Sequence, residues 1–107
     1  FCYISFRVPN DFASLTSVKV IVIPDLTGSF DWTVNTTFGA NGETVTANSD
    51  SVTADTQACT ANTFLELDIS AAYTALAAND IVGTKFLVDV LTTVTYLCVV
   101  GLNVKYM

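Results

Sequence analysis

Residues 30–38 read Phe-Asp-Trp-Thr-Val-Asn-Thr-Thr-Phe, and their large and polar side chains alternate. Successive side chains of a β-strand point to opposite faces of a sheet. One face of this segment would therefore carry the larger side chains, Phe30, Trp32, Val34, Thr36 and Phe38. The alternation predicts a strand whose aromatic face lies in the core and whose polar face lies outside.

The same pattern recurs along the chain, in which threonine and valine, two residues that favour strands, are the commonest. Residues 16–23 are nearly continuously apolar, which predicts a strand covered on both faces. A polar connection is expected at 48–62, with at most a short strand at 51–54. The remaining expected strands are 2–8, 43–47, 63–69, 81–90 and 94–106.

Turn signals separate these strands. Asn41-Gly42 suits the positive φ angles of a type I′ turn and predicts a hairpin that returns along residues 43–47. Thr92-Thr93 is expected to turn the chain into the last strand. Ser70 can cap one or two turns of helix, which predicts one short helix near 70–78.

A chain of 107 residues provides one core, so residues 1–107 are expected to form a single domain. Strands without βαβ units predict an all-β, antiparallel β-sandwich. A jelly roll is the first topology expected and an immunoglobulin-like sandwich the second. The chain opens with Phe1 rather than methionine, and we therefore expect it to be part of, or processed from, a longer chain.

Charge and residue types exclude several classes of function. The net charge of −6 argues against binding to nucleic acid. The most apolar stretch, 86–102, is interrupted by Asp89 and threonines, so no membrane span is expected. Histidine is absent, and Leu26 breaks the one stretch similar to an aspartic protease motif, residues 25–29. We expect neither catalysis nor a cofactor.

The three cysteines form no metal-binding motif. Cys2 and Cys98 fall in the first and last expected strands, which neighbour one another in many sandwiches. A disulfide between them is one alternative, and two small buried hydrophobic side chains are the other.

Acidic residues gather in the middle of the chain, since no lysine or arginine occurs between Lys19 and Lys85. Asp50 and Asp55 are weak candidates for a calcium site, because calcium prefers carboxylate ligands. The spacing of an established calcium loop is missing, and a solvated acidic rim is the favoured interpretation. No metal site is predicted.

Aromatic side chains expected outside the core could stack on sugar rings, as in carbohydrate-binding sandwiches. The candidates are Tyr3, Phe64, Tyr73 and Tyr96. A carbohydrate-binding or adhesin module is therefore the alternative function.

Three segments carry a resemblance to a known type of domain: residues 6–12, Phe-Arg-Val-Pro-Asn-Asp-Phe; residues 14–18, Ser-Leu-Thr-Ser-Val; and residues 78–83, Ala-Asn-Asp-Ile-Val-Gly, with Phe86 beyond. With them the chain resembles an uncharacterised β-sandwich domain of predicted phage and environmental virion structural proteins. The resemblance implies a structural role and no active site.

Low charge on strands with apolar faces also favours a subunit that covers its surfaces with neighbours. We expect a structural or assembly module of a virion (a capsid, decoration or tail surface protein) or of a similar extracellular assembly. Its partners would be further copies of the chain or other subunits of a particle. Residues 2–8 and 94–104 are the expected contact strands.

Overall fold

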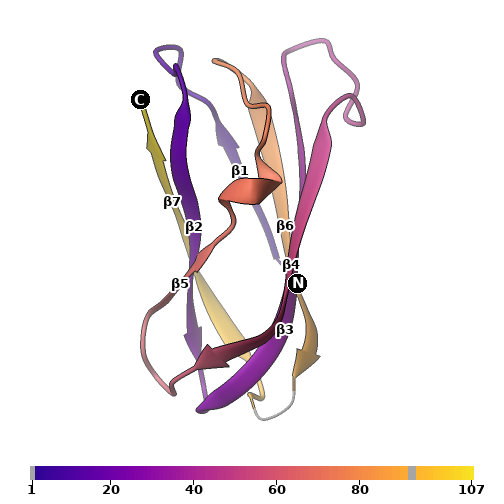
Figure 1. The fold of residues 1–107 in the computed structure, drawn as a ribbon. Helices are drawn as coiled ribbons and strands as arrows, with labels where there is room; N and C mark the ends of the chain where they lie inside the picture. The colour runs from indigo at the N-terminus through magenta and orange to yellow at the C-terminus, as the bar shows by residue number, and fades with distance from the viewer. Residues whose placement is uncertain (1, 92–93) are drawn as a thin grey trace.

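The computed structural model describes residues 2–91 and 94–107, and in these residues the chain forms seven strands and one 3-10 turn. They assemble into a four-stranded sheet, β1-β6-β3-β4, and a three-stranded sheet, β5-β2-β7, both antiparallel (Figure 1). The prediction of an all-β sandwich is confirmed. The elements are β1 (Cys2–Arg7), β2 (Leu15–Pro24), β3 (Gly28–Gly39), β4 (Ser49–Cys59), β5 (Leu65–Asp68), η1 (Ser70–Ala72), β6 (Ile81–Leu91) and β7 (Leu97–Tyr106).

The strands pair in a nested order. β3 pairs with β4, β2 with β5, and β1 with β6, as in one long hairpin that has been rolled up. Rolling adds the pairs β3–β6 and β2–β7. Nested pairing of this kind is a feature that jelly rolls share. An immunoglobulin-like sandwich places its first two strands in one sheet, whereas β1 and β2 lie in different sheets.

The core lies between the inner faces of the sheets. Every second residue of β3 from Phe30 to Phe38 is buried, which confirms the predicted alternation. Trp32 stacks on Phe86 of β6, with ring centroids 6.1 Å apart. Alternation within residues 81–90 also predicts an inward side chain at Val90. That side chain lies outside the described part of the structure, as does the expected turn at 92–93.

β2 has one covered face. Val18, Val20 and Val22 point inward and are fully buried, whereas Ile21 and Ile23 on the outer face are only partly buried. The expectation that the chain covers both faces of this strand is therefore wrong: no element of the described residues packs over the outer face of the three-stranded sheet.

The hairpin at Asn41-Gly42 has a longer loop than predicted. The returning strand is β4, not residues 43–47, and residues 40–48 connect it to β3. Gly42 adopts a φ of +96°, but Asn41 does not adopt a positive φ, so no type I′ turn forms. The Glu43 carboxylate instead accepts a hydrogen bond of 2.7 Å from the Ala40 N–H, which closes the loop locally.

β4 occupies most of the expected polar connection. Its apolar side chains that pack on the core are all small: Val52, Ala54 and Cys59. They lie among serine, threonine and aspartate, so the alternation of β4 is weak in the sequence. A bulge follows at Thr56, which has a φ of +54° and donates its N–H to the Asp31 carboxylate at 2.8 Å. Pairing with β3 thus extends a strand expected only at 51–54.

The helix predicted near 70–78 is reduced to the single 3-10 turn η1. The Ser70 hydroxyl does not cap a helix, because it accepts the Val18 N–H at 2.9 Å and donates to the Asp68 carboxylate. Further along, the Asp80 carboxylate accepts the Ala77 N–H at 2.9 Å and closes a turn before β6. Among the described residues, no helix has the length and apolar character needed to cross a membrane.

Candidate functional site

The outer face of the three-stranded sheet carries an apolar patch. Ile23 lies opposite Cys98 in the pairing of β2 with β7, and Ile21 lies beside the bulge that contains Val100. Phe64 lies directly before β5 and two positions before Glu66, so its side chain points to the same outer face as that of Glu66. Phe64 is 75% exposed and Val100 is 52% exposed. We call these five residues the outer patch: Ile21, Ile23, Phe64, Cys98 and Val100.

The other end of this face is charged. Lys19 forms an ion pair with Glu66 across β2 and β5, with 3.5 Å between Nζ and Oε2. The Ser70 hydroxyl and N–H both donate to Asp68, and these bonds lower the pKa of that carboxyl. The face therefore has a charged, well-solvated half and an apolar half, and the apolar half is the part suited to contact with another protein.

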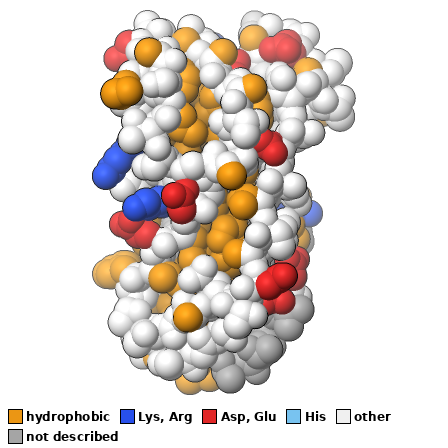
Figure 2. All heavy atoms as spheres, in the orientation of Figure 1, with side chains coloured by type: hydrophobic (Ala, Val, Ile, Leu, Met, Phe, Trp, Pro, Cys, Tyr) orange, Lys and Arg blue, Asp and Glu red, His pale blue; other side chains and the backbone are white. Residues whose placement is uncertain are grey.

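The seam between the sheets is partly open on the side of β4 and β5. Figure 2 shows apolar side chains along the middle of this side, with charged side chains along its flanks. Val52 and Ala54 of β4 and Leu65 of β5 are the partly buried residues that pack against the core here. η1 contributes a partial cover, because it lies against β4 and β2.

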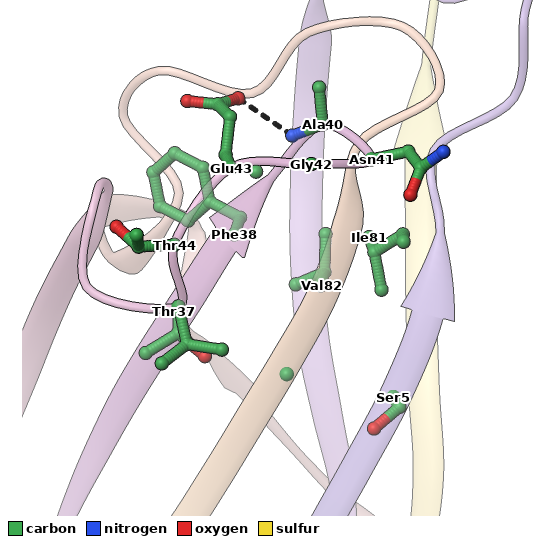
Figure 3. A pocket seen from close by; sticks show the side chains of 13 residues that line it. Ser5, Thr37, Phe38, Ala40, Asn41, Gly42, Glu43, Thr44, Ile81 and Val82 are labelled. Atoms are coloured by element: carbon green, nitrogen blue, oxygen red, sulfur yellow. Dashed lines mark hydrogen bonds between the residues drawn. The ribbon is translucent and has the colours of Figure 1, made fainter.

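A hollow of about 410 Å³ lies beside the loop between β3 and β4 (Figure 3). Ser5, Thr37 and Val82 line it from three strands, and residues 40–45 of the loop complete the lining. Phe38 in its wall is buried, so it offers no free face for stacking on a sugar ring. The Glu43 carboxylate at the rim is turned toward the Ala40 N–H.

The structure does not join Cys2 to Cys98, and within residues 2–91 and 94–107 all three cysteines are free thiols. Cys2 points inward and packs against the core, whereas Cys98 is exposed in the outer patch. Burial raises the pKa of the Cys2 thiol. Cys59 is buried and directs its thiol to the carbonyl of Leu26 at 3.6 Å.

The candidate sugar-binding aromatics do not form one face. Tyr3 is 67% exposed on β1, where its ring lies 5.7 Å from the Lys85 ammonium, and Phe64 lies on the opposite side of the sandwich. Tyr96, also exposed, precedes β7. Tyr73 was expected outside but is buried, which corrects the prediction for this residue.

Hydrogen bonds that the sequence alone does not reveal hold Tyr73 in its buried position. Its phenol oxygen lies 2.6 Å from the hydroxyl oxygen of Thr84 on β6, and the Thr36 hydroxyl of β3 donates to the Ala72 carbonyl. Desolvation raises the pKa of Tyr73, and the bond to Thr84 opposes this only in part. These contacts fix η1 over the core.

Asp50 and Asp55 lie apart on β4. Asp50 accepts hydrogen bonds from the Thr74 hydroxyl and from the Ser51 N–H, which lower the pKa of its carboxyl. Asp55 is exposed beside the bulge. In the described residues no cluster of three or more cysteine and acidic side chains has the geometry to hold a metal ion.

Asp25 performs a structural task at the turn between β2 and β3. Its Oδ1 accepts the N–H groups of Thr95 and Tyr96 at 2.9 and 3.2 Å, which attaches this turn to the start of β7. Desolvation acts to raise the pKa of Asp25, but the bonds from Tyr96 and Thr95 outweigh it and lower the pKa.

Comparisons of the chain with protein-family models, curated proteins and solved structures found no match.

Proposed function

We propose that this chain is a non-enzymatic structural module that assembles with other subunits through its sheet faces. The observation that carries the proposal is the outer patch. Residues 16–23 have the composition of a strand with two covered faces, yet the described chain covers only one of them. A contiguous apolar area on a sheet is typical of a protein interaction surface.

The distribution of charge supports the same proposal. Ile21, Ile23 and Val100 bring no charge into a contact, so little desolvation cost opposes their burial. The net charge of −6 keeps separate subunits soluble before they meet. The partners would be further copies of the chain or other structural subunits.

A virion, or a similar extracellular particle, is the assembly that we propose. The support is the resemblance of residues 6–12 and 78–83 to virion sandwich domains. The structure brings these segments together: the Val8 N–H donates to the Asp80 carbonyl at 2.8 Å, and the Asn79 N–H donates to the Val8 carbonyl at 3.0 Å. These two segments therefore build one corner of the sandwich.

Sedimentation velocity tests the proposal. The wild-type chain should sediment as an oligomer whose size increases with concentration, and Val100→Glu should shift it toward the monomer. Val45→Glu is the matched control, because Val45 is 79% exposed in the loop between β3 and β4. A wild-type monomer at every concentration would contradict assembly through this patch. Retention of that monomer on a polysaccharide gel would favour the carbohydrate-binding alternative.

A further inference from the structure

β7 is the one described strand that has no partner in the nested pairs of the rolled hairpin. Each strand from β1 to β6 has one in the described chain: β1 has β6, β2 has β5, and β3 has β4. β7 pairs with β2 through rolling, and within residues 2–91 and 94–107 its other edge bonds to no strand. The nested pairs run outward from β3–β4 through β2–β5 to β1–β6. One further pair in this order would place an antiparallel strand along the open edge of β7.

The core is incompletely covered at the same place. A hollow of about 470 Å³ opens between the sheets where β1 and β7 begin. Cys2, Val88, Leu97 and Val99 line it, and although these side chains pack against the core they are only partly buried. By contrast, Val18, Val20 and Val22 of β2, which has neighbours on both sides, are fully buried. One more strand beside β7 would direct alternate side chains into this hollow.

A second folded copy could pair with this edge through its own β7, but it would leave the hollow unfilled. Leu97 and Val99 of each copy already point into the core of that copy. The occupant must be an extended segment whose inward face is free. Its outward face would meet Lys105, which is exposed near the end of β7. Because opposite charges on facing strands attract, an acidic residue fits opposite Lys105.

We propose that the open edge of β7 is an acceptor for one extended peptide strand, an arm of a neighbouring subunit. The strand runs antiparallel to β7, inserts small apolar side chains at alternate positions, and carries an acidic residue opposite Lys105. Main-chain hydrogen bonds provide affinity, and the hollow selects the alternating pattern. The neighbouring subunit as the source of the arm rests on the proposed function.

The test uses synthetic peptides of ten residues, the length of β7. The first alternates valine with threonine and has glutamate near its amino end, where an antiparallel strand would meet Lys105. A second has lysine in place of that glutamate, and a third has proline at two central positions. Binding is measured by fluorescence anisotropy, and amide hydrogen exchange of the chain is followed by NMR.

The glutamate peptide should bind and slow the exchange of β7 amides by about tenfold or more, because each new main-chain bond must open before exchange. Amides of β4, an edge strand of the other sheet that lies away from the hollow, should not change. The lysine peptide should bind about two- to fivefold more weakly, and Lys105→Glu should reverse this preference. Lys85→Glu, on the outer face of the four-stranded sheet, is the matched charge control.

Equal binding of the proline peptide, or protection of β4 in place of β7, would overturn the proposal. Protection of β7 that rises with protein concentration in the absence of peptide would also overturn it, because the edge would then be filled by a second copy. Peptide binding by a chain that sediments as a monomer would support the acceptor edge and refute assembly through the outer patch. Assembly without peptide binding would do the reverse.

Discussion

The phenol oxygen of Tyr73 lies 2.6 Å from the hydroxyl oxygen of Thr84, and both residues are buried. This bond joins the segment after η1 to the inner face of β6. A buried hydroxyl that loses its partner must bear its full desolvation penalty, so the pair contributes to stability as a unit.

Tyr73→Phe and Thr84→Val should each lower the free energy of unfolding by about 1–3 kcal/mol, because each leaves the other hydroxyl without this partner. The double variant should lose less than the sum of the two. Urea denaturation measures all three values. Tyr96→Phe, at an exposed tyrosine, is the control and should change stability by less than about 0.5 kcal/mol. Simple additivity in the double variant would contradict the coupling.

The pKa of Asp25 is lowered in the folded chain, so its ionised form favours folding. This contribution is complete above the ordinary range of aspartate, about pH 4, and is lost as the pH falls through the lowered folded pKa. Asp25→Asn should therefore reduce the urea midpoint at pH 7 and change it little at pH 2.5. The same substitution at exposed Asp55 is the control. A larger effect of Asp25→Asn in acid than at neutral pH would contradict this role.

Gly42 has a φ of +96°, a conformation that side chains with a Cβ rarely adopt. Gly42→Ala should lower the free energy of unfolding by about 1 kcal/mol, although no atom would contact the new Cβ within 4 Å. Ala40→Gly in the same loop separates strain from a general change in loop flexibility. A stabilising effect of Gly42→Ala in urea denaturation would show that the loop readily adopts another conformation.

The three thiols should react with a maleimide at different rates. Cys98 is exposed and should be modified first, Cys2 more slowly because it is half-buried with a raised pKa, and Cys59 last because it is buried. Mass spectrometry of peptides from a timed reaction measures the order. Assembly through the outer patch should slow Cys98 selectively. Fast modification of Cys59 in the native chain would contradict the structure.

Sequence patterns predicted the strands with large inward side chains. They failed where contacts between distant segments determine the secondary structure. Residues 30–38 were predicted because every inward position except Thr36 is large and apolar. β4 was predicted only at 51–54 because it is an edge strand with small inward residues, and its pairing with β3 determines its length. The helix at 70–78 was predicted from Ser70 as a cap, but the Ser70 hydroxyl bonds to Val18, a contact invisible to local patterns.

The candidate site residues were misplaced for similar reasons. A bulge in β7 changes which alternate residues point inward: Leu97 and Val99 do so before it, and Leu102 and Val104 after it. Strict alternation over the whole strand therefore could not assign Cys98 to a face. Tyr73 was expected outside because its partner Thr84 lies eleven positions away, on another element. The outer patch did have a signal, because the continuous apolar run at 16–23 indicated that both faces of this strand need a cover.

The nested order of pairs also sets an order in time. The pair β3–β4 closes the shortest loop, β2–β5 a longer one, and β1–β6 a longer one still. Loop-closure entropy increases with length, so formation is expected to proceed outward from the β3–β4 hairpin. β1 and β7 then join the sandwich late, when the remaining core is already in place. The open edge of β7 thus forms last during synthesis and refolding. At that stage neighbouring chains can contact it.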